Sequence, residues 1–309
     1  MMRKVEILDS RASLLVPGSE QLEQLATGAA WSEGPIWMAE DSSVLWSDIP
    51  NNRMLRWHPS EGQSVWREQV EFTNGHCREA DGALLHCSHG HRAIVRTRKP
   101  FGAGKSVDEI VVDHYQGKRL NSPNDVVVKS DGSIWFSDPP YGIASNNEGH
   151  QAESELGVNY VFRFDTKTGA LTAVSDFVEE PNGLAFSPDE TQLYVSDTSA
   201  ALRKDGSGNH HIVRFDVVGG VALANPKIFA VIQPGLSDGF RLDSRGWIFT
   251  SSEDGVQIIH PDGTLLAKIP VPEKVGNLTF GGPLRSELFI CAGTSLYRIR
   301  LNATGIQTP

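Results

Sequence analysis

The amino-acid sequence predicts an all-β fold built from six repeated units. Each unit starts with a polar residue and continues with an apolar stretch, a turn rich in Asp, Gly or Ser, and a stretch rich in aromatic and β-branched residues. A third and usually a fourth apolar stretch follow, so each unit is expected to form a four-stranded antiparallel sheet. Six such sheets in succession are typical of a six-bladed β-propeller, whose blades pack radially around a central channel.

The first two strands are the most regular part of each unit. In the third copy, NDVVVKSDGSIWFSD, two β-branched and aromatic stretches flank an Asp-Gly turn. In chain order the six copies occupy residues 33–48, 74–88, 124–138, 182–197, 238–252 and 277–293. The third strands are predicted at residues 53–59, 93–99, 159–165, 211–217, 256–262 and 295–301. The fourth strands of the first five units are predicted at residues 63–70, 107–113, 171–177, 226–232 and 264–270.

The two ends of the repeat region predict a closed ring. The sixth unit stops after its third strand, whereas QLEQLATG at residues 21–28 resembles a fourth strand without a sheet of its own. If this segment completes the sixth sheet, closure removes two free strand edges. We therefore expect a lead-in over residues 1–20 and a single domain over residues 21–309.

Composition limits the classes of partner. The formal net charge of -10 argues against nucleic acid, because phosphate binding favours a basic surface. No apolar run is long enough to predict a transmembrane helix, and residues 1–15 lack the uninterrupted apolar region of a signal peptide. We expect a cytoplasmic protein that binds neither nucleic acid nor a membrane.

The cysteines and histidines offer weaker signals. Cys77, Cys87 and Cys291 lack CxxC spacing, and the first two lie on either side of a predicted hairpin turn where they could face each other. Two free thiols are favoured over a disulfide, because disulfides are rare in the cytoplasm. His89 and His91 have a spacing that also fits zinc, which is a minor alternative.

The first residue of every unit has an oxygen-bearing side chain, and we call these six residues the anchors. They are Glu33, Asn74, Asn124, Asn182, Asp238 and Asn277. The innermost strand of each blade lines the channel of a β-propeller, so residues that start these strands are expected to converge near the axis. Turns favour Asn and Asp but not Glu. Glu33 stands between Trp31 and Trp37 with no Lys or Arg beside it, and burying an unpaired charge is costly.

A divalent cation explains the carboxylate of Glu33. Calcium binds carboxylate, amide carbonyl and water oxygens. Glu33 and Asp238 would balance the double charge of the ion, while Asn124 and Asn182 would add neutral carbonyl ligands. Mg²⁺, Mn²⁺ and Zn²⁺ are alternatives to Ca²⁺, because oxygen-rich sites accept several ions.

The chain resembles the family of six-bladed β-propellers that contains gluconolactonases, senescence marker protein and luciferin-regenerating enzyme. The matching phrases are WSEGPIW, GKRLNSPNDVVVKSDGSIWFSDPPYG, EEPNGLAFSPDE and LSDGFRLDSRG, which together span nearly the whole chain from about residue 25. The resemblance implies a calcium or similar divalent ion held by Glu33, Asn124, Asn182 and Asp238. It also implies hydrolysis of a small sugar lactone, most simply D-glucono-1,5-lactone by a gluconolactonase.

The predicted metal site suggests a reaction sequence. The cation would polarise the lactone carbonyl and stabilise the oxyanion, while a water attacks the carbonyl carbon. Asp238 is the predicted catalytic residue, as the base that takes the proton of this water, because its carboxylate sits at an Asp-Gly turn. Direct attack by Asp238 remains an alternative. The chain has no G-x-S-x-G motif that would support a serine hydrolase.

Several other residues are predicted to contact the substrate. Arg119, Asn121 and Ser122 lie just before an anchor, and Arg119 has the alternative of a solvated loop charge. The polar insertion at residues 143–159, with Tyr141 at its base, is long enough to cover the site, and a second insertion lies at residues 198–211. The remaining candidates near the channel are Asn74, His89 and His76.

Two other functions compete with the lactonase hypothesis. A phosphotriesterase-like hydrolase would use the same metal site, and the residues do not separate these reactions. A non-enzymatic propeller would serve as a binding module, but such a module does not require the pair Glu33 and Asp238. A condensing enzyme similar to strictosidine synthase is disfavoured by the predicted ligand set.

Overall fold

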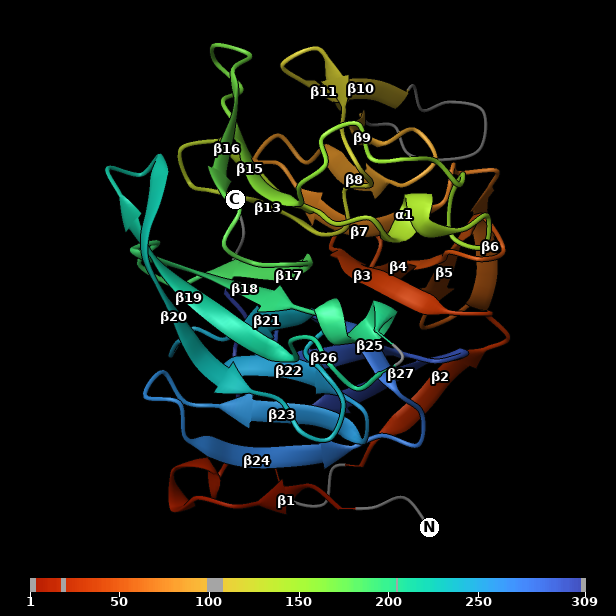
Figure 1. Ribbon diagram of the computed structural model, residues 1–309. Coiled ribbons are helices and arrows are strands. Elements are labelled where there is room, and N and C mark those ends of the chain that lie inside the picture. Colours follow the sequence, from red (N-terminus) through yellow and green to blue (C-terminus); the bar gives the residue numbers. More distant parts are fainter. Residues whose placement is uncertain (1–3, 18–20, 99–107, 204, 307–309) are drawn as a thin grey trace.

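The computed structural model describes residues 4–17, 21–98, 108–203 and 205–306. Six antiparallel blades surround a common centre, as predicted; five have four strands, and a short extra strand adds a fifth to the other (Figure 1). Parts of the predicted lead-in (1–3 and 18–20), the ends of two predicted strands (99 and 107), position 204 and the last three residues lie outside the described residues.

The first three blades follow one another along the chain. From the axis outward, blade one contains β3 (Ser32–Met38), β4 (Ser43–Asp48), β5 (Arg53–His58) and β6 (Gly62–Glu68). Blade two contains β7 (Thr73–Arg78), β8 (Leu84–Ser88), β9 (Ala93–Thr97) and β10 (Asp108–Val112). A small ribbon of β11 (His114–Tyr115) and β12 (Lys118–Arg119) precedes blade three. Blade three contains β13 (Val126–Val128), β14 (Ile134–Asp138), β15 (Tyr160–Phe164) and β16 (Leu171–Ser175).

The other three blades have the same order. Blade four contains β17 (Pro181–Phe186), β18 (Gln192–Asp197), β19 (His211–Val218) and β20 (Ala222–Val231). Blade five contains β21 (Phe240–Leu242), β22 (Ile248–Ser252), β23 (Gly255–Ile259) and β24 (Leu265–Pro270). Blade six contains β25 (Val275–Gly281), β26 (Glu287–Ala292), β27 (Ser295–Arg300) and, at its outer edge, β2 (Glu23–Thr27).

The N-terminal part of the chain completes the ring. Strand β2 pairs antiparallel with β27, with Glu23 opposite Arg298 and Thr27 opposite Ser295, as the sequence predicts. The preceding segment is also partly ordered into the fold, because β1 (Glu6–Ile7) pairs with β24 as a fifth strand of blade five. The first and last blades are therefore joined through backbone hydrogen bonds.

The apolar core lies between neighbouring blades. Phe249 of blade five meets Phe280 of blade six edge-to-face, with ring centroids 5.0 Å apart. Trp37 of blade one stacks on Phe289 of blade six at 5.6 Å. Each pair joins two neighbouring blades, so side-chain packing helps to hold the sheets of the ring together.

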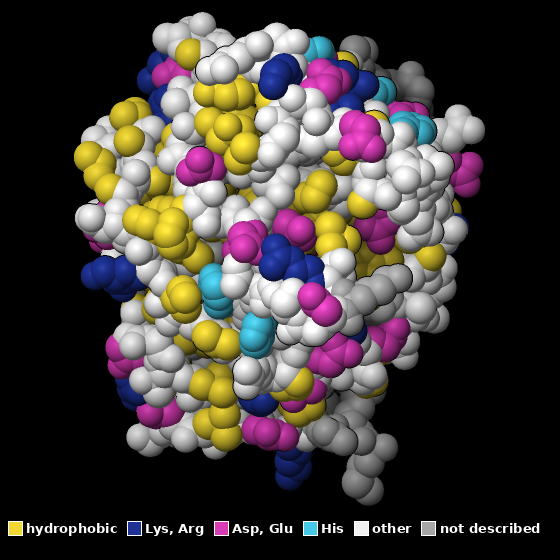
Figure 2. Space-filling model, viewed as in Figure 1, with side chains coloured by type: hydrophobic (Ala, Val, Ile, Leu, Met, Phe, Trp, Pro, Cys, Tyr) yellow, Lys and Arg dark blue, Asp and Glu magenta, His cyan; other side chains and the backbone are white. Residues whose placement is uncertain are grey.

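The cysteines and the surface complete the description of the fold. Cys77, Cys87 and Cys291 are buried free thiols, and Cys77 lies opposite Leu85 rather than a second cysteine. Acidic and basic side chains are interspersed on the face shown in Figure 2. Among the helices of the described residues, none has the length and apolarity needed to cross a membrane.

Candidate active site

Close contacts between the innermost strands bring the anchors together. The backbone N–H of Gly75 donates to the carbonyl oxygen of Asn124 at 2.9 Å, and that of Gly183 donates to the carbonyl oxygen of Asp238 at 3.0 Å. A Cβ atom at Gly75 would lie 2.6 Å from the Asn124 oxygen, and one at Gly183 would lie 2.4 Å from the Asp238 oxygen. Only glycine allows this approach, which is why a glycine follows the anchors Asn74 and Asn182 in the sequence.

The same kind of contact continues around the ring. Gly34, with a φ of 51°, faces the carbonyl oxygen of Asn74, 2.2 Å from where its Cβ would stand. Gly239 donates its backbone N–H to Gly276 at 2.8 Å. A Cβ at Gly276 would lie 2.2 Å from Oε1 of Glu33, so blade six closes against blade one. The anchors therefore converge at one end of the channel.

A recurrent Ser-Asp pair at the end of the second strand supports the anchors from behind. Ser47 donates its hydroxyl to the carbonyl oxygen of Asn74 at 2.8 Å, and Ser196 donates to that of Asp238 at 2.9 Å. Each aspartate accepts a backbone N–H from the segment leading into its own blade, at 2.8 to 2.9 Å; they are Asp48, Asp138 and Asp197. The recurring letters SD were a signal for this role that the sequence analysis did not use.

Glu33 is buried and incompletely satisfied. Its Oε2 accepts the backbone N–H of Gly34 at 3.0 Å, whereas Oε1 has no hydrogen-bond partner among the described residues. Burial raises the pKa of Glu33 well above its ordinary value, and the negative charge of Asp238 raises it further. The two acids therefore lie close enough to repel each other.

Asp238 is half-buried, whereas Glu33 is buried. Burial raises the pKa of Asp238 to about 7, and the negative charge of Glu148 acts in the same direction. Lys274 and a hydrogen bond from Asn182 act against this rise. Within the described residues, the carboxylate is not neutralised by an ion pair at hydrogen-bond distance.

Two of the asparagine anchors, Asn74 and Asn182, turn their amide nitrogens toward fixed acceptors. Nδ2 of Asn74 lies 3.3 Å from Nε2 of His89, and Nδ2 of Asn182 donates to Oγ1 of Thr198 at 3.3 Å. Oδ1 of Asn74 is buried without a hydrogen-bond partner in the described part of the chain. An amide whose nitrogen is engaged in this way presents its carbonyl oxygen elsewhere, which suits a cation more than an anion.

These residues fit a hard divalent cation. Two clustered carboxylates, a buried carboxylate oxygen without a partner and amide oxygens are the donor set that calcium prefers. Across the described residues, no group of three or more His, Cys, Asp or Glu side chains could share a metal ion. An ion at the anchors would therefore depend on the asparagine carbonyls of Asn124 and Asn182 as well as on the two acids.

His89 orients one side of the site. Its Nδ1 lies 2.8 Å from the carbonyl oxygen of Glu148, and a carbonyl only accepts, so Nδ1 carries the proton. Nε2 is then the acceptor for the amide of Asn74. Burial lowers the pKa of His89 to about 4, which keeps the ring neutral at pH 7. The zinc alternative finds no support in the part of the chain that the structure describes: no three His, Cys, Asp or Glu side chains there could share an ion, and His91 is exposed and makes its hydrogen bonds through its backbone.

The predicted insertion reaches the site through Glu148. A short helix, α1 (Tyr141–Ala144), begins the insertion, and the backbone of Glu148 then holds His89 while its charge acts on Asp238. Tyr141 is the first residue of α1, and its hydroxyl lies 2.5 Å from Oγ1 of Thr198 and 2.9 Å from Oε2 of Glu180. Because Thr198 starts the second insertion and also contacts an anchor, Tyr141 links both insertions to the site.

Three other predicted residues are engaged in holding the loops. Arg119 donates its guanidinium to the carbonyl oxygen of His91 at 2.9 Å. The amide of Asn121 donates to the carbonyl oxygen of Asp138 at 3.2 Å, and the hydroxyl of Ser122 donates to that of Pro139 at 2.6 Å. Their contact with a substrate stays a prediction, but the geometry already gives each side chain a structural partner.

Two cations near the anchors were not identified from the sequence. Arg241 is half-buried in the channel and pairs with Asp125 through Nη1 at 3.1 Å. Burial lowers the pKa of Arg241, but the charge of Asp125 and, to a smaller extent, that of Glu33 raise it above its ordinary value. Lys274 lies 5.9 Å from the ring centroid of Trp31 and acts on Asp238. Neither residue is adjacent to an anchor in the sequence, so only the closed ring brings these charges together.

Comparisons with known proteins show which family the chain belongs to. A gluconolactonase from Zymomonas mobilis is 33% identical over 323 residues, covering 98% of this chain and 87% of that protein. A pentonolactonase from Haloferax volcanii is 27% identical over 85% of this chain and 82% of its own length. The solved structure of a gluconolactonase from Xanthomonas campestris superposes with a TM-score of 0.88 at 38% identity, covering 97% of this chain and 95% of that one. The profile of the SMP-30/gluconolactonase/LRE-like region matches residues 31–294, and the chain belongs to this family.

Proposed function

We propose that this protein is a metal-dependent hydrolase that opens sugar lactones, with D-glucono-1,5-lactone as the first substrate to test. The observation that carries the proposal is the cluster of Glu33, Asn124, Asn182 and Asp238 at one end of the channel, in a chain similar along its length to gluconolactonases. The pentonolactonase similarity supports the coarser class of sugar lactones rather than one ring.

The four residues would hold the cation, with Glu33 and Asp238 balancing its charge. When bound, a divalent ion would polarise the lactone carbonyl and stabilise negative charge on its oxygen. Glu33 is suited to holding the ion, because its buried carboxylate has one oxygen without a partner. Ca²⁺ is the first choice for this oxygen-rich set, ahead of Mg²⁺, Mn²⁺ and Zn²⁺.

Asp238 is the proposed general base. Its half-buried carboxylate is the more accessible of the two acids, so it is better placed than Glu33 to meet a water. Asp238 takes a proton from this water as the water oxygen bonds to the carbonyl carbon. The bond between the carbonyl carbon and the ring oxygen then breaks, and Asp238 gives the proton to the departing ring oxygen, which becomes a hydroxyl. The products are an open-chain hydroxy acid and the regenerated carboxylate.

Other residues would position the sugar ring. Asn74 and His89 form a fixed polar pair beside the anchors, and Tyr141 lies where the two insertions meet. Direct hydrogen bonds to sugar hydroxyls are proposed for these three residues. For Arg119, Asn121 and Ser122 we propose a supporting role through the loop contacts that they already make.

Chelation tests the metal requirement. Hydrolysis of D-glucono-1,5-lactone is measured before and after EDTA treatment, and again after adding Ca²⁺, Mg²⁺, Mn²⁺ or Zn²⁺. We expect activity to fall at least about 100-fold and to return with an added ion, because the positive charge at the carbonyl oxygen is lost. Calorimetry of Ca²⁺ binding to wild type and Glu33→Gln gives a second readout. Full activity in EDTA would contradict the proposed site.

A substrate panel separates the alternatives on the same scaffold. The panel contains gluconolactone, a pentonolactone and diethyl 4-nitrophenyl phosphate. Faster turnover of the phosphate triester would favour the phosphotriesterase reading. No turnover of any of the three compounds in the metal-loaded protein would favour a binding module.

A further inference from the structure

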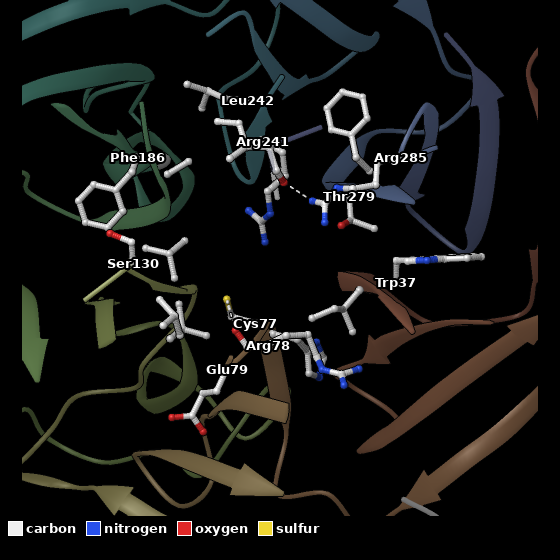
Figure 3. Close-up of a pocket in the computed structure, with 18 of the residues that line it drawn as sticks. Trp37, Cys77, Arg78, Glu79, Ser130, Phe186, Arg241, Leu242, Thr279 and Arg285 are labelled. Carbon is white, nitrogen blue, oxygen red and sulfur yellow. Dashed lines mark hydrogen bonds between the residues drawn. The ribbon is translucent and has the colours of Figure 1, made fainter. Parts of the chain in front are cut away.

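A cavity lies at the end of the channel opposite the anchors. The anchors start the innermost strands, whereas this cavity is lined where those strands end, by Arg78, Val128, Phe186, Leu242 and Thr279 among others. Its volume is about 990 Å³, which is large enough for a small organic ligand. Figure 3 shows its side chains pointing from several blades into one central space. We call it the strand-end cavity.

Most charges around the strand-end cavity are already paired. Glu79 pairs with Arg96 at 2.5 Å, and Glu190 pairs with Lys129 at 3.0 Å. Glu40 lies 3.1 Å from Nη1 of Arg78. These acidic side chains are therefore already engaged, and they do not balance the charge of a further basic side chain in the cavity wall.

Arg285 is the exception. Its guanidinium donates to the carbonyl oxygen of Ile306, and its Nε is buried without a hydrogen-bond partner in the described part of the chain. No carboxylate of the described residues lies within ion-pair distance of it. Burial lowers the pKa of Arg285, and no neighbouring acid opposes this effect. A half-buried guanidinium without a counter-charge favours an anion from outside the chain.

The surroundings of Arg285 indicate the rest of the ligand. Thr279 lies next to Arg285 on one side of the cavity, and Phe186 faces them from the other side (Figure 3). Val128 and Leu242 add apolar wall between them. We propose that the strand-end cavity binds a small organic carboxylate, whose anionic group pairs with Arg285 and Thr279 and whose apolar body lies against Phe186.

This site is separate from the candidate active site. Arg241 and Asp125 form a buried ion pair within the channel, and Arg241 also lines the strand-end cavity. The ion pair stands between the cavity and Glu33, whose charge acts on Arg241. A ligand at Arg285 therefore does not occupy the place of the lactone.

Calorimetric titration tests the proposal with octanoate as the anionic probe and octanamide as its uncharged match, at pH 7.5. We expect one octanoate per chain to bind, and octanamide to bind at least about tenfold more weakly, because the charge-assisted hydrogen bond to the guanidinium is missing. Arg285→Gln should abolish this preference, and Phe186→Ala should weaken both probes. Arg203→Gln, at an exposed arginine of the other end, is the matched control.

A second variant covers the case in which Arg285→Gln does not fold. Thr279→Val keeps the side-chain shape and should weaken octanoate while leaving octanamide unchanged. The proposal is overturned if octanoate and octanamide bind equally, or if Arg285→Gln and Thr279→Val both leave octanoate binding unchanged. It is also overturned if octanoate competes with gluconolactone and loses its affinity in Asp238→Asn, since the probe would then occupy the anchor end.

Discussion

Asp238 and Glu33 are neighbouring acids whose burial and hydrogen bonds suit them to different roles. Glu33 is buried with one oxygen bound to the backbone of Gly34, whereas Asp238 retains accessible surface and receives an amide from Asn182. Burial raises the pKa of both carboxylates; the negative charge of Asp238 adds to the rise at Glu33, and that of Glu148 adds to the rise at Asp238. The accessible carboxylate is suited to proton transfer, and the buried one to holding an ion.

The first prediction concerns Asp238→Asn. Turnover of gluconolactone should fall at least about 100-fold, because the amide cannot accept the proton of the attacking water. Without added metal the variant should be at least as stable to urea as wild type, since the repulsion with Glu33 is removed. Steady-state kinetics and circular dichroism check both outcomes. Asp176→Asn, at an exposed acid, is the control and should change neither. Undiminished turnover in Asp238→Asn would place the base elsewhere.

A buried histidine pair gives a prediction about pH. His86 lies edge-to-face with His76, and its Nε2 is 2.6 Å from Oγ1 of Thr97. Burial lowers the pKa of His86 to about 3, with the charges of His76 and Arg67 acting in the same direction and Asp108 against it. The unfolded chain takes up a proton near pH 6.5, whereas the folded chain does so only near pH 3. Stability is therefore lost as pH falls between these values.

Urea unfolding at pH 7 and pH 5 measures this effect. Wild type should lose on the order of 2 kcal/mol of unfolding free energy from His86 over this interval. His86→Gln should be less stable than wild type at pH 7 but lose less on acidification, because glutamine does not titrate. An equal loss in both proteins would mean that His86 is already protonated in the folded state at pH 5.

At the scale of the strands, the fold depends on where neighbouring innermost strands touch. Strand β13 begins after Asn124, whose carbonyl oxygen is bound by Gly75 at the start of β7. The short sequence Asn-Gly thus serves two purposes, since the first residue supplies an anchor and the second allows the next strand to approach. These backbone contacts determine how far apart the anchors lie in the folded protein.

Gly75→Ala tests the contact between β7 and β13. The added methyl group would stand 2.6 Å from the Asn124 oxygen and 2.7 Å from Oδ1 of Asp125, so the strands must separate. We expect a loss of about 1–3 kcal/mol in unfolding free energy and a fall in turnover, because Asn124 is displaced. Gly117→Ala, in open space at a φ of 79°, should lower stability without affecting turnover. Unchanged turnover in Gly75→Ala would separate this contact from the site.

At the scale of the whole molecule, the N-terminal strand determines whether the ring is closed. Ala26 of β2 is buried in the cluster between blades one and six, together with Trp46 and Phe289. Without β2, the edge of β27 would be unpaired and this cluster would lose one wall. Closure joins residues that are far apart in the chain, so its contribution is a property of the complete ring.

Ala26→Asp tests closure without shortening the chain. A carboxylate at this buried position has no cation to pair with in the cluster, and we expect a loss of about 3 kcal/mol in unfolding free energy. Thr27→Asp places the same charge at the exposed neighbouring position and should change stability little. Urea unfolding followed by circular dichroism compares the two variants. Equal stability of both would show that β2 contributes little to closure.

The sequence by itself determined the repeat, and therefore the six blades, the role of residues 21–28 and the anchor set. These features are local patterns or their periodic recurrence, which strand geometry translates directly into structure. The tertiary structure decided which charges meet. Arg241 reaches Asp125 across 116 positions of the chain, and Glu148 reaches Asp238 from the tip of an insertion. The guanidinium of Arg285, which has no acidic partner among the described residues, likewise depends on which acids the other blades bring near it. Such encounters arise only when the ring closes, because electrostatic interactions depend on distance in space and on burial rather than on position in the sequence.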